Sequence, residues 1–269
     1  MDISNCQTML FRLTNYMKYF LFAGHRKGHG IHSPFVFDLI TKVFRNKSTP
    51  DVVLNIEKAR KRLKTNKCVI DVTDRGAGSK KLGGDKRKVS DIVRHSSVPK
   101  KYGKLLYNLA AEFGGEAIIE LGTSLGLSTL YLAFGSPGST VHTIEGSVEI
   151  AKLAGQTFEA EGIKNIRIYE GTFEEILPGI LDTGMKPGLV FIDGNHRKRP
   201  VLNYFKMLEA VAVNDTVIVI DDIFYSAGMF EAWQEIKKHK RVSVTIDLYR
   251  MGLVFFREGI THNDYIIRY

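Results

Sequence analysis

The stretch EAIIELGTSLGLSTLYLAF, residues 116–134, decides the fold of this chain. Its first six residues are largely apolar, which is typical of a strand that is buried on both faces. Gly122 and Gly126 follow, and the apolar residues after them have the spacing of a buried helix. A strand that turns through glycines directly into a helix is the opening half of a βαβ unit. The stretch therefore predicts an α/β fold built on a parallel sheet.

The same alternation of strand and helix continues along the chain. Apolar strands are expected at residues 116–121, 140–145, 166–171, 188–193 and 216–221. Helical stretches follow them at residues 127–134, 147–162, 173–181, 199–213 and 228–239. Two more strands, 242–249 and 252–257, are separated only by Arg250 and Met251, so they must pair as an antiparallel hairpin. We expect a doubly wound, mostly parallel seven-stranded sheet, Rossmann-like, that ends in this hairpin.

The first third of the chain has a different character. Residues 1–114 hold 23 Lys and Arg against 9 Asp and Glu, a balance of +14, whereas the remainder has a balance of −5. Helical spacing predicts helices near residues 3–22, 35–44, 52–63 and 90–113, the last with a break at Pro99. The Gly- and Lys-rich segment 74–88 is expected to be a mobile loop. We predict a basic, mostly helical extension at 1–99 and a catalytic domain at 100–269.

Composition places the chain among ordinary globular proteins. Its two cysteines, Cys6 and Cys68, are far apart and fit neither a metal motif nor a disulfide framework, which favours a reducing compartment. The N-terminal apolar residues are interrupted by Arg12, Asn15 and Lys18, so they predict neither a signal peptide nor a membrane-spanning helix. The cytoplasm is the expected location.

The first strand end and its turn carry the most specific motif. In an open α/β sheet, ligands bind beyond the carboxyl ends of the strands, and the amides at a helix N-terminus can face an anionic group. A dinucleotide site would require glycine where the chain has Ser124 and Leu127. The acidic-x-Gly pattern of ELGTSLGLSTL and the terminal hairpin instead resemble the class I S-adenosylmethionine-dependent methyltransferases, and more closely the catechol O-methyltransferase-like branch. The resemblance covers roughly residues 100–269.

The resemblance implies a set of cofactor-binding residues at successive strand ends. In the first turn Ser128 would contact the methionine carboxylate of S-adenosylmethionine. Glu145, which closes the second strand, has a carboxylate suited to the two ribose hydroxyls. Gly171 and Thr172 would border the adenine. The complete set is Glu120, Gly122, Thr123, Ser124, Gly126, Ser128, Glu145, Gly171, Thr172 and Asp193.

Three carboxylates lie at the next two strand ends. Asp193 ends the fourth strand, and Asp221 and Asp222 end the fifth. Because neighbouring carboxylates repel unless they share a cation, we expect a divalent metal, Mg²⁺ in particular, held by Asp193, Asp221 and Asp222. The resembled branch places its metal ligands at these same strand ends, often with Asn where this chain has Asp222. The alternative is that Asp222 caps the next helix and Asp221 pairs with a neighbouring Lys or Arg.

His196, three residues after Asp193, stands where the resembled branch often has a lysine general base. Histidine is a competent base near neutral pH, although it could also be a fourth ligand or a solvated loop residue. With Asp193 it forms the predicted catalytic pair. The substitution argues against catechol substrates.

These features predict a metal-assisted S-adenosylmethionine-dependent O-methyltransferase of a small-molecule hydroxyl, with the helical extension capping the site. One alternative is an RNA methyltransferase whose basic first third binds phosphates. Another is a non-catalytic methyltransferase-like scaffold, and a nicotinamide oxidoreductase is disfavoured by the glycine pattern. A homodimer would be compatible with each of these. The sequence names neither the substrate nor the oligomeric state.

Overall fold

The computed structural model describes residues 3–24, 30–46, 50–72 and 86–269. The chain divides into two compact units. Unit 1 consists of Met1–Arg45 and Val190–Tyr269, and unit 2 of Asn46–Leu189. These units differ from the predicted division into an extension at 1–99 and a catalytic domain at 100–269, which remains a prediction about function.

The predicted α/β class is confirmed, with one strand more than expected. The large sheet has eight strands in the order β10-β8-β9-β7-β6-β3-β4-β5. The added strand is β10, which pairs parallel to β8. Its sequence, NDYI, is polar and mostly exposed, so it lacks the apolar pattern that reveals the others. The strands are β3 (Ala117–Leu121), β4 (Thr140–Glu145), β5 (Ile166–Glu170), β6 (Pro187–Ile192), β7 (Val217–Ile220), β8 (Val244–Asp247), β9 (Gly252–Phe255) and β10 (Asn263–Ile266).

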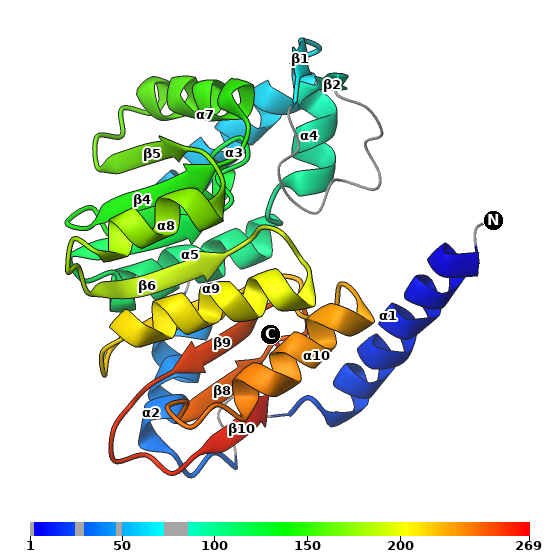
Figure 1. The fold of residues 1–269 in the computed structure, drawn as a ribbon, viewed down its shortest axis with the longest axis vertical. Coiled ribbons are helices and arrows are strands. Elements are labelled where there is room, and N and C mark those ends of the chain that lie inside the picture. The colour runs from blue at the N-terminus through cyan, green and yellow to red at the C-terminus, as the bar shows by residue number, and fades with distance from the viewer. Residues whose placement is uncertain (1–2, 25–29, 47–49, 73–85) are drawn as a thin grey trace. The chain divides into compact units, whose positions relative to one another are not determined.

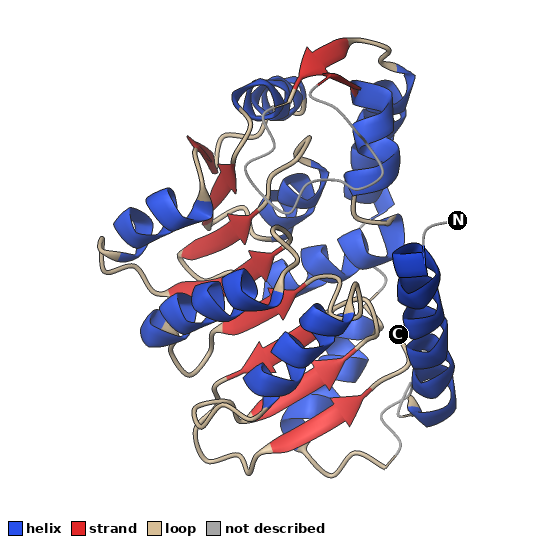
Figure 2. Ribbon diagram, turned by 45° about the vertical axis from the view of Figure 1, so that its right-hand side comes forward, coloured by secondary structure: helices blue, strands red, loops and turns tan. Residues whose placement is uncertain are grey.

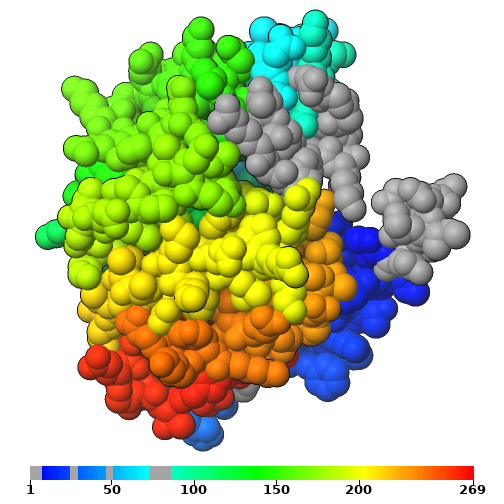
Figure 3. All heavy atoms as spheres, viewed as in Figure 1, coloured from blue at the N-terminus to red at the C-terminus, as the bar shows by residue number. Residues whose placement is uncertain are grey.

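The helices predicted between strands are all formed. In unit 1, α9 and α10 lie on one face of the strands and α2 on the other (Figures 1 and 2). The side chains of α9 and α10, yellow and orange, adjoin on the face shown in Figure 3. In unit 2, α8 and α5 lie on opposite faces of the strands (Figure 1). These helices are α6 (Leu127–Gly135), α7 (Val148–Ala160), α8 (Phe173–Leu181), α9 (Lys198–Val211) and α10 (Ala227–Lys237).

The first third is mostly helical, as predicted, with a few differences. The segment 35–44 divides into a short α-helix and one π-helical stretch. Residues 74–85 of the predicted loop lie outside the described residues, and its last three residues form β2, which pairs antiparallel with β1. The elements are α1 (Ile3–Phe22), α2 (Pro34–Asp38), η1 (Leu39–Phe44), α3 (Pro50–Thr65), β1 (Val69–Asp71), β2 (Lys86–Lys88), α4 (Val89–Ser96) and α5 (Lys100–Phe113). None of the helices that the structure describes is long and apolar enough to span a membrane.

Helix α1 is joined to the far end of the chain within unit 1. The Tyr19 hydroxyl donates to the carbonyl of Ile267 at 2.7 Å, and Gly24 forms a parallel bridge with the same residue. Much of the helix nevertheless remains uncovered. The apolar side chains that are more than half exposed are Met9, Leu10, Leu13, Leu21 and Phe22.

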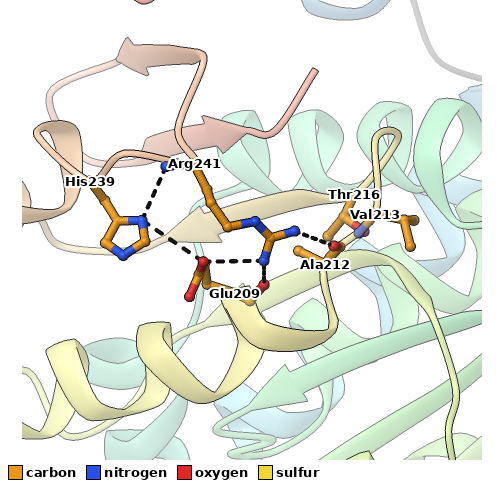
Figure 4. Close-up of polar contacts among 6 residues, drawn as sticks. All are labelled: Glu209, Ala212, Val213, Thr216, His239 and Arg241. Atoms are coloured by element: carbon orange, nitrogen blue, oxygen red, sulfur yellow. Dashed lines mark hydrogen bonds and ion pairs between the residues drawn. The ribbon is translucent and has the colours of Figure 1, made fainter. Parts of the chain in front are cut away.

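A second attachment in unit 1 fixes the end of α9 and the turn into β7 (Figure 4). The Arg241 guanidinium donates to the carbonyl of Ala212 at 2.9 Å and to the Glu209 carboxylate at 3.1 Å. It also donates to the Glu209 carbonyl. Carbonyls at a helix C-terminus have no partner within the helix, so a cationic donor there stabilises both the helix end and the strand that follows.

Candidate active site

The first strand of the site in unit 2 ends in a carboxylate that is fully buried. Glu120, on β3, accepts hydrogen bonds on Oε2 from the hydroxyls of Thr129 at 2.5 Å and Thr143 at 2.6 Å. Its other oxygen, Oε1, is buried and has no hydrogen-bond donor among the described residues. Burial raises the pKa of Glu120 to about 7, and the hydroxyls of Thr129, Thr143 and Ser128 oppose that rise.

The turn after β3 requires glycine at two positions. Gly122 has a φ of 108° and Gly126 a φ of 82°, both in the left-handed region. A Cβ on Gly126 would lie 2.4 Å from Cε1 of Phe158, so a side chain there would collide with the ring. Gly126 is also the N-cap of α6. These constraints explain why the chain reverses here and leaves the first amides of α6 at the carboxyl end of β3.

Glu145 connects the loops that follow β3 and β4. Its Oε2 accepts from the amide of Ser124 at 2.9 Å, and its Oε1 accepts from the amide of Ser147 at 3.0 Å. The parallel register pairs Leu121 with Ile144, which places Glu145 at the edge where β3 ends. Each carboxylate oxygen can accept more than one hydrogen bond, so the group can also accept hydroxyls from a ligand.

Other predicted cofactor residues of unit 2 occupy the same edge, but the hydroxyls of two of them have structural partners. The Thr123 hydroxyl lies 2.6 Å from that of Thr143. Thr172 caps α8 by accepting from the amide of Glu175 at 3.3 Å. Gly171 donates its amide to the carbonyl of Glu145 at 3.0 Å. Backbone geometry, rather than free hydroxyls, therefore shapes this edge.

A second group of polar residues lies in unit 1, after β6 and β7. Asp221 is fully buried, and both its oxygens accept from Arg250: Oδ1 from Nε at 3.0 Å and Oδ2 from Nη2 at 2.6 Å. Asp222, which is partly exposed, has Oδ1 3.9 Å from the same Nη2. Burial, and then the charge of Asp222, raises the pKa of Asp221, while the guanidinium opposes this. We regard Asp221 as ionised because the two-pronged contact matches a carboxylate to a permanent cation.

The predicted metal site of Asp193, Asp221 and Asp222 is not formed. The described part of the chain has no cluster of three or more His, Cys, Asp or Glu that could hold a metal ion. Asp221 instead pairs with an arginine, which confirms the alternative that the sequence left open. The other half of that alternative is wrong, because the N-cap of α10 is Ser226 and not Asp222.

His196 and Asp193 lie close together after β6. Nε2 of His196 is 3.6 Å from Oδ1 of Asp193, and both side chains are largely buried. The His196 ring lies 5.6 Å from that of Tyr225, whose carbonyl accepts from Nε of Arg12 at 2.9 Å. The Arg12 guanidinium also lies 4.3 Å from the centre of the Tyr225 ring, so α1 orders the loop after β7.

Sequence reasoning missed Arg250, Tyr225 and Arg12. Arg250 could have been found from the predicted hairpin, since an antiparallel β9 beside β7 brings the hairpin turn to the carboxyl end of β7. Tyr225 and Arg12 offered no such signal, because their contact joins residues 213 positions apart.

Comparison with known proteins agrees with this geometry. Residues 119–223 match a family model described as a methyltransferase domain. The resemblance to the class I methyltransferases is confirmed. A catechol O-methyltransferase from Niastella koreensis is 31% identical over 130 residues, which cover 47% of this chain and 58% of that relative. The match thus spans little more than half of the relative's length.

Solved structures share the fold. An SAH-bound O-methyltransferase from Bacillus cereus has a TM-score of 0.55 at 19% identity, covering 82% of this chain and 95% of that chain. The SAH-bound methyltransferase PaMTH1 from Podospora anserina has a TM-score of 0.59 at 14% identity, covering 84% and 97%. At such identities the likeness establishes the fold alone.

We expect Glu120→Gln to remove a pH-dependent loss of stability. Because the folded pKa of about 7 exceeds the carboxyl group's ordinary pKa of 4.5 in the unfolded chain, the folded state holds this proton more tightly, and stability falls as pH rises between these values. A shift of this size corresponds to roughly 3 kcal/mol. Urea unfolding from pH 5 to pH 8 should show the free energy of unfolding of the variant rising relative to wild type as pH increases. Glu170→Gln, on an exposed carboxylate, is the control.

Arg250→Met should destabilise the protein by about 3–5 kcal/mol, because it leaves Asp221 buried without its cation. Asp221→Asn combined with Arg250→Met should recover part of this loss, since no charge is then buried. Arg94→Met breaks an exposed helix-surface pair with Asp91 and should cost less than about 1 kcal/mol. Strictly additive losses in the double variant would show that the pair is not coupled.

Proposed function

We propose that this chain is an S-adenosylmethionine-dependent O-methyltransferase that acts on a small-molecule hydroxyl. The observation that carries the proposal is the hydrogen bond from the Ser124 amide to Glu145. It fixes a carboxylate at the end of β4 against the glycine turn that follows β3. A dinucleotide enzyme would also use such a carboxylate, but the chain lacks the dinucleotide glycine pattern in that turn.

The residues of this edge suit the proposed cofactor. Glu145 would accept the ribose hydroxyls, and the first amides of α6 would face the methionine carboxylate of the cofactor. Among the described residues, none donates a hydrogen bond to Oε1 of Glu120. Gly171 would border the adenine, with Thr172 holding the start of α8 in place. When bound, S-adenosylmethionine supplies an electrophilic methyl group on a positively charged sulfur.

His196 is the proposed general base for the acceptor hydroxyl. Asp193, 3.6 Å away, would stabilise the imidazolium formed when His196 takes the proton. This gives Asp193 a role in catalysis beside its predicted contact with the cofactor. Tyr225 borders the imidazole, and Arg12 fixes Tyr225, which is how the helical extension would contribute to the acceptor side.

S-adenosylhomocysteine should bind, and Glu145→Ala should weaken it by about 10- to 100-fold, the range expected for hydrogen bonds to a charged group. Isothermal titration calorimetry measures this directly. Glu149→Ala, at an exposed position in the first turn of α7, should bind like wild type. Binding of NAD without any binding of S-adenosylhomocysteine would defeat the proposal.

His196→Ala should slow methyl transfer by about two to four orders of magnitude while the affinity for S-adenosylhomocysteine stays unchanged. The assay follows a labelled methyl group from the cofactor into a panel of small hydroxy compounds and into RNA. Added imidazole should restore part of the activity, and the exposed His95→Ala should match wild type. Transfer into RNA alone would favour the nucleic-acid alternative.

A further inference from the structure

The carboxylates after β7 already have a resident cation. The methyltransferase branch that this chain resembles implies a divalent metal at this place, and that metal would need the oxygens of Asp221. Both oxygens are held by Arg250 at 3.0 and 2.6 Å, and the side chain of Asp221 has no exposed surface. The donor set therefore does not fit a metal ion.

Arg250 is fixed in this position by the backbone of the hairpin. The register of β7 and β9 pairs Ile220 with Gly252, so the β8–β9 turn stands beside Asp221. The carbonyl of Arg250 accepts from the amide of Ile223 at 3.2 Å. Tyr249, in the same turn, has a φ of 69° and donates its amide to the Asp247 carboxylate at 2.8 Å. The guanidinium thus belongs to the framework of unit 1.

The guanidinium of Arg250 interacts electrostatically with all three carboxylates that were expected to bind the metal. Besides its contacts with Asp221, Arg250 has Nη2 3.9 Å from Asp222, and the charge of Asp193 also favours its protonated form. Its own side chain is about a quarter exposed, at 28%. A guanidinium remains protonated at any physiological pH, so this positive charge is permanent.

We propose that Arg250 takes the place of the divalent cation, so that the protein binds no metal at Asp193, Asp221 and Asp222 and methylates a single hydroxyl without one. The inference rests on the proposed function for its statement about methyl transfer. A metal ion offers open coordination positions to which both oxygens of a vicinal diol can bind, whereas a guanidinium offers only N–H donors. The acceptor therefore needs only one hydroxyl, whose proton His196 removes, and a second neighbouring hydroxyl, as in a catechol, would find no metal ion to bind.

The test measures metal binding directly. The full chain is freed of metal with EDTA and dialysed, and its melting temperature is recorded with and without millimolar Mg²⁺ or Mn²⁺, both alone and with S-adenosylhomocysteine. We expect no change for wild type. Arg250→Met, in which the carboxylates lose their cation, should gain a metal-dependent rise of at least about 2 °C. Arg250→Gln, which keeps one N–H donor near Asp221 but no charge, gives the same test if the Met variant does not fold.

The matched control is the double variant Asp221→Asn with Arg250→Met, which should lose the metal response again. A metal-dependent rise in wild type would overturn the inference, because the site would then accept a cation in the presence of Arg250. The absence of any response in both single variants would also overturn it, since the carboxylates would then form no cation site for Arg250 to fill. Failure to bind S-adenosylhomocysteine would defeat the proposed function while leaving these melting experiments interpretable.

Discussion

The ion pair between Asp221 and Arg250 holds together the part of unit 1 that contains the proposed catalytic residues, namely the ends of β6 and β7 and the loops that follow them. A carboxylate withdrawn from water is costly unless its charge is compensated nearby, and here the compensation comes from the turn of the β8–β9 hairpin. The pair therefore ties the end of β7 to that hairpin and sets the position of the loop that contains Tyr225. The same loop receives Arg12 from α1, so the first helix and the last strands meet through one short segment.

Glu120 presents the opposite solution to the same physical problem. It is as deeply buried as Asp221, yet no arginine or lysine forms an ion pair with it among the described residues, and its partners are the hydroxyls of Thr129 and Thr143. Hydroxyl donors compensate a charge only in part, so the carboxyl holds its proton up to about pH 7. One strand end thus carries a permanent ion pair, and the other carries a group whose charge changes near neutrality.

Much of the fold could be predicted from the sequence because apolar strands alternate regularly with helices. The strands around Glu120, Glu145 and Asp193 were placed to within a residue or two, and the parallel pairing of β3 with β4 brings Glu120 and Glu145 to one edge of unit 2. The polar strand β10 was not predicted, because nothing in its composition distinguishes it from a loop. The partner of Asp221 could not be predicted from the residues next to it in the sequence. Whether two adjacent carboxylates bind a metal or an arginine depends here on the register of β9, a strand that begins some thirty residues later.

The way in which unit 1 is assembled has a consequence for how the protein is made. In the sequence its two parts, Met1–Arg45 and Val190–Tyr269, come before and after the whole of unit 2. Tyr19 forms a hydrogen bond with a residue 248 positions further along the chain. At about 5–20 residues per second, a ribosome needs on the order of 10–50 s to supply that partner. For most of this interval Phe11 of α1 lacks its ring partner Phe230, and Tyr16 lacks Tyr249. The nascent chain is thus open to chaperones and to aggregation through its first helix, and unit 2 is free to fold before unit 1 is complete.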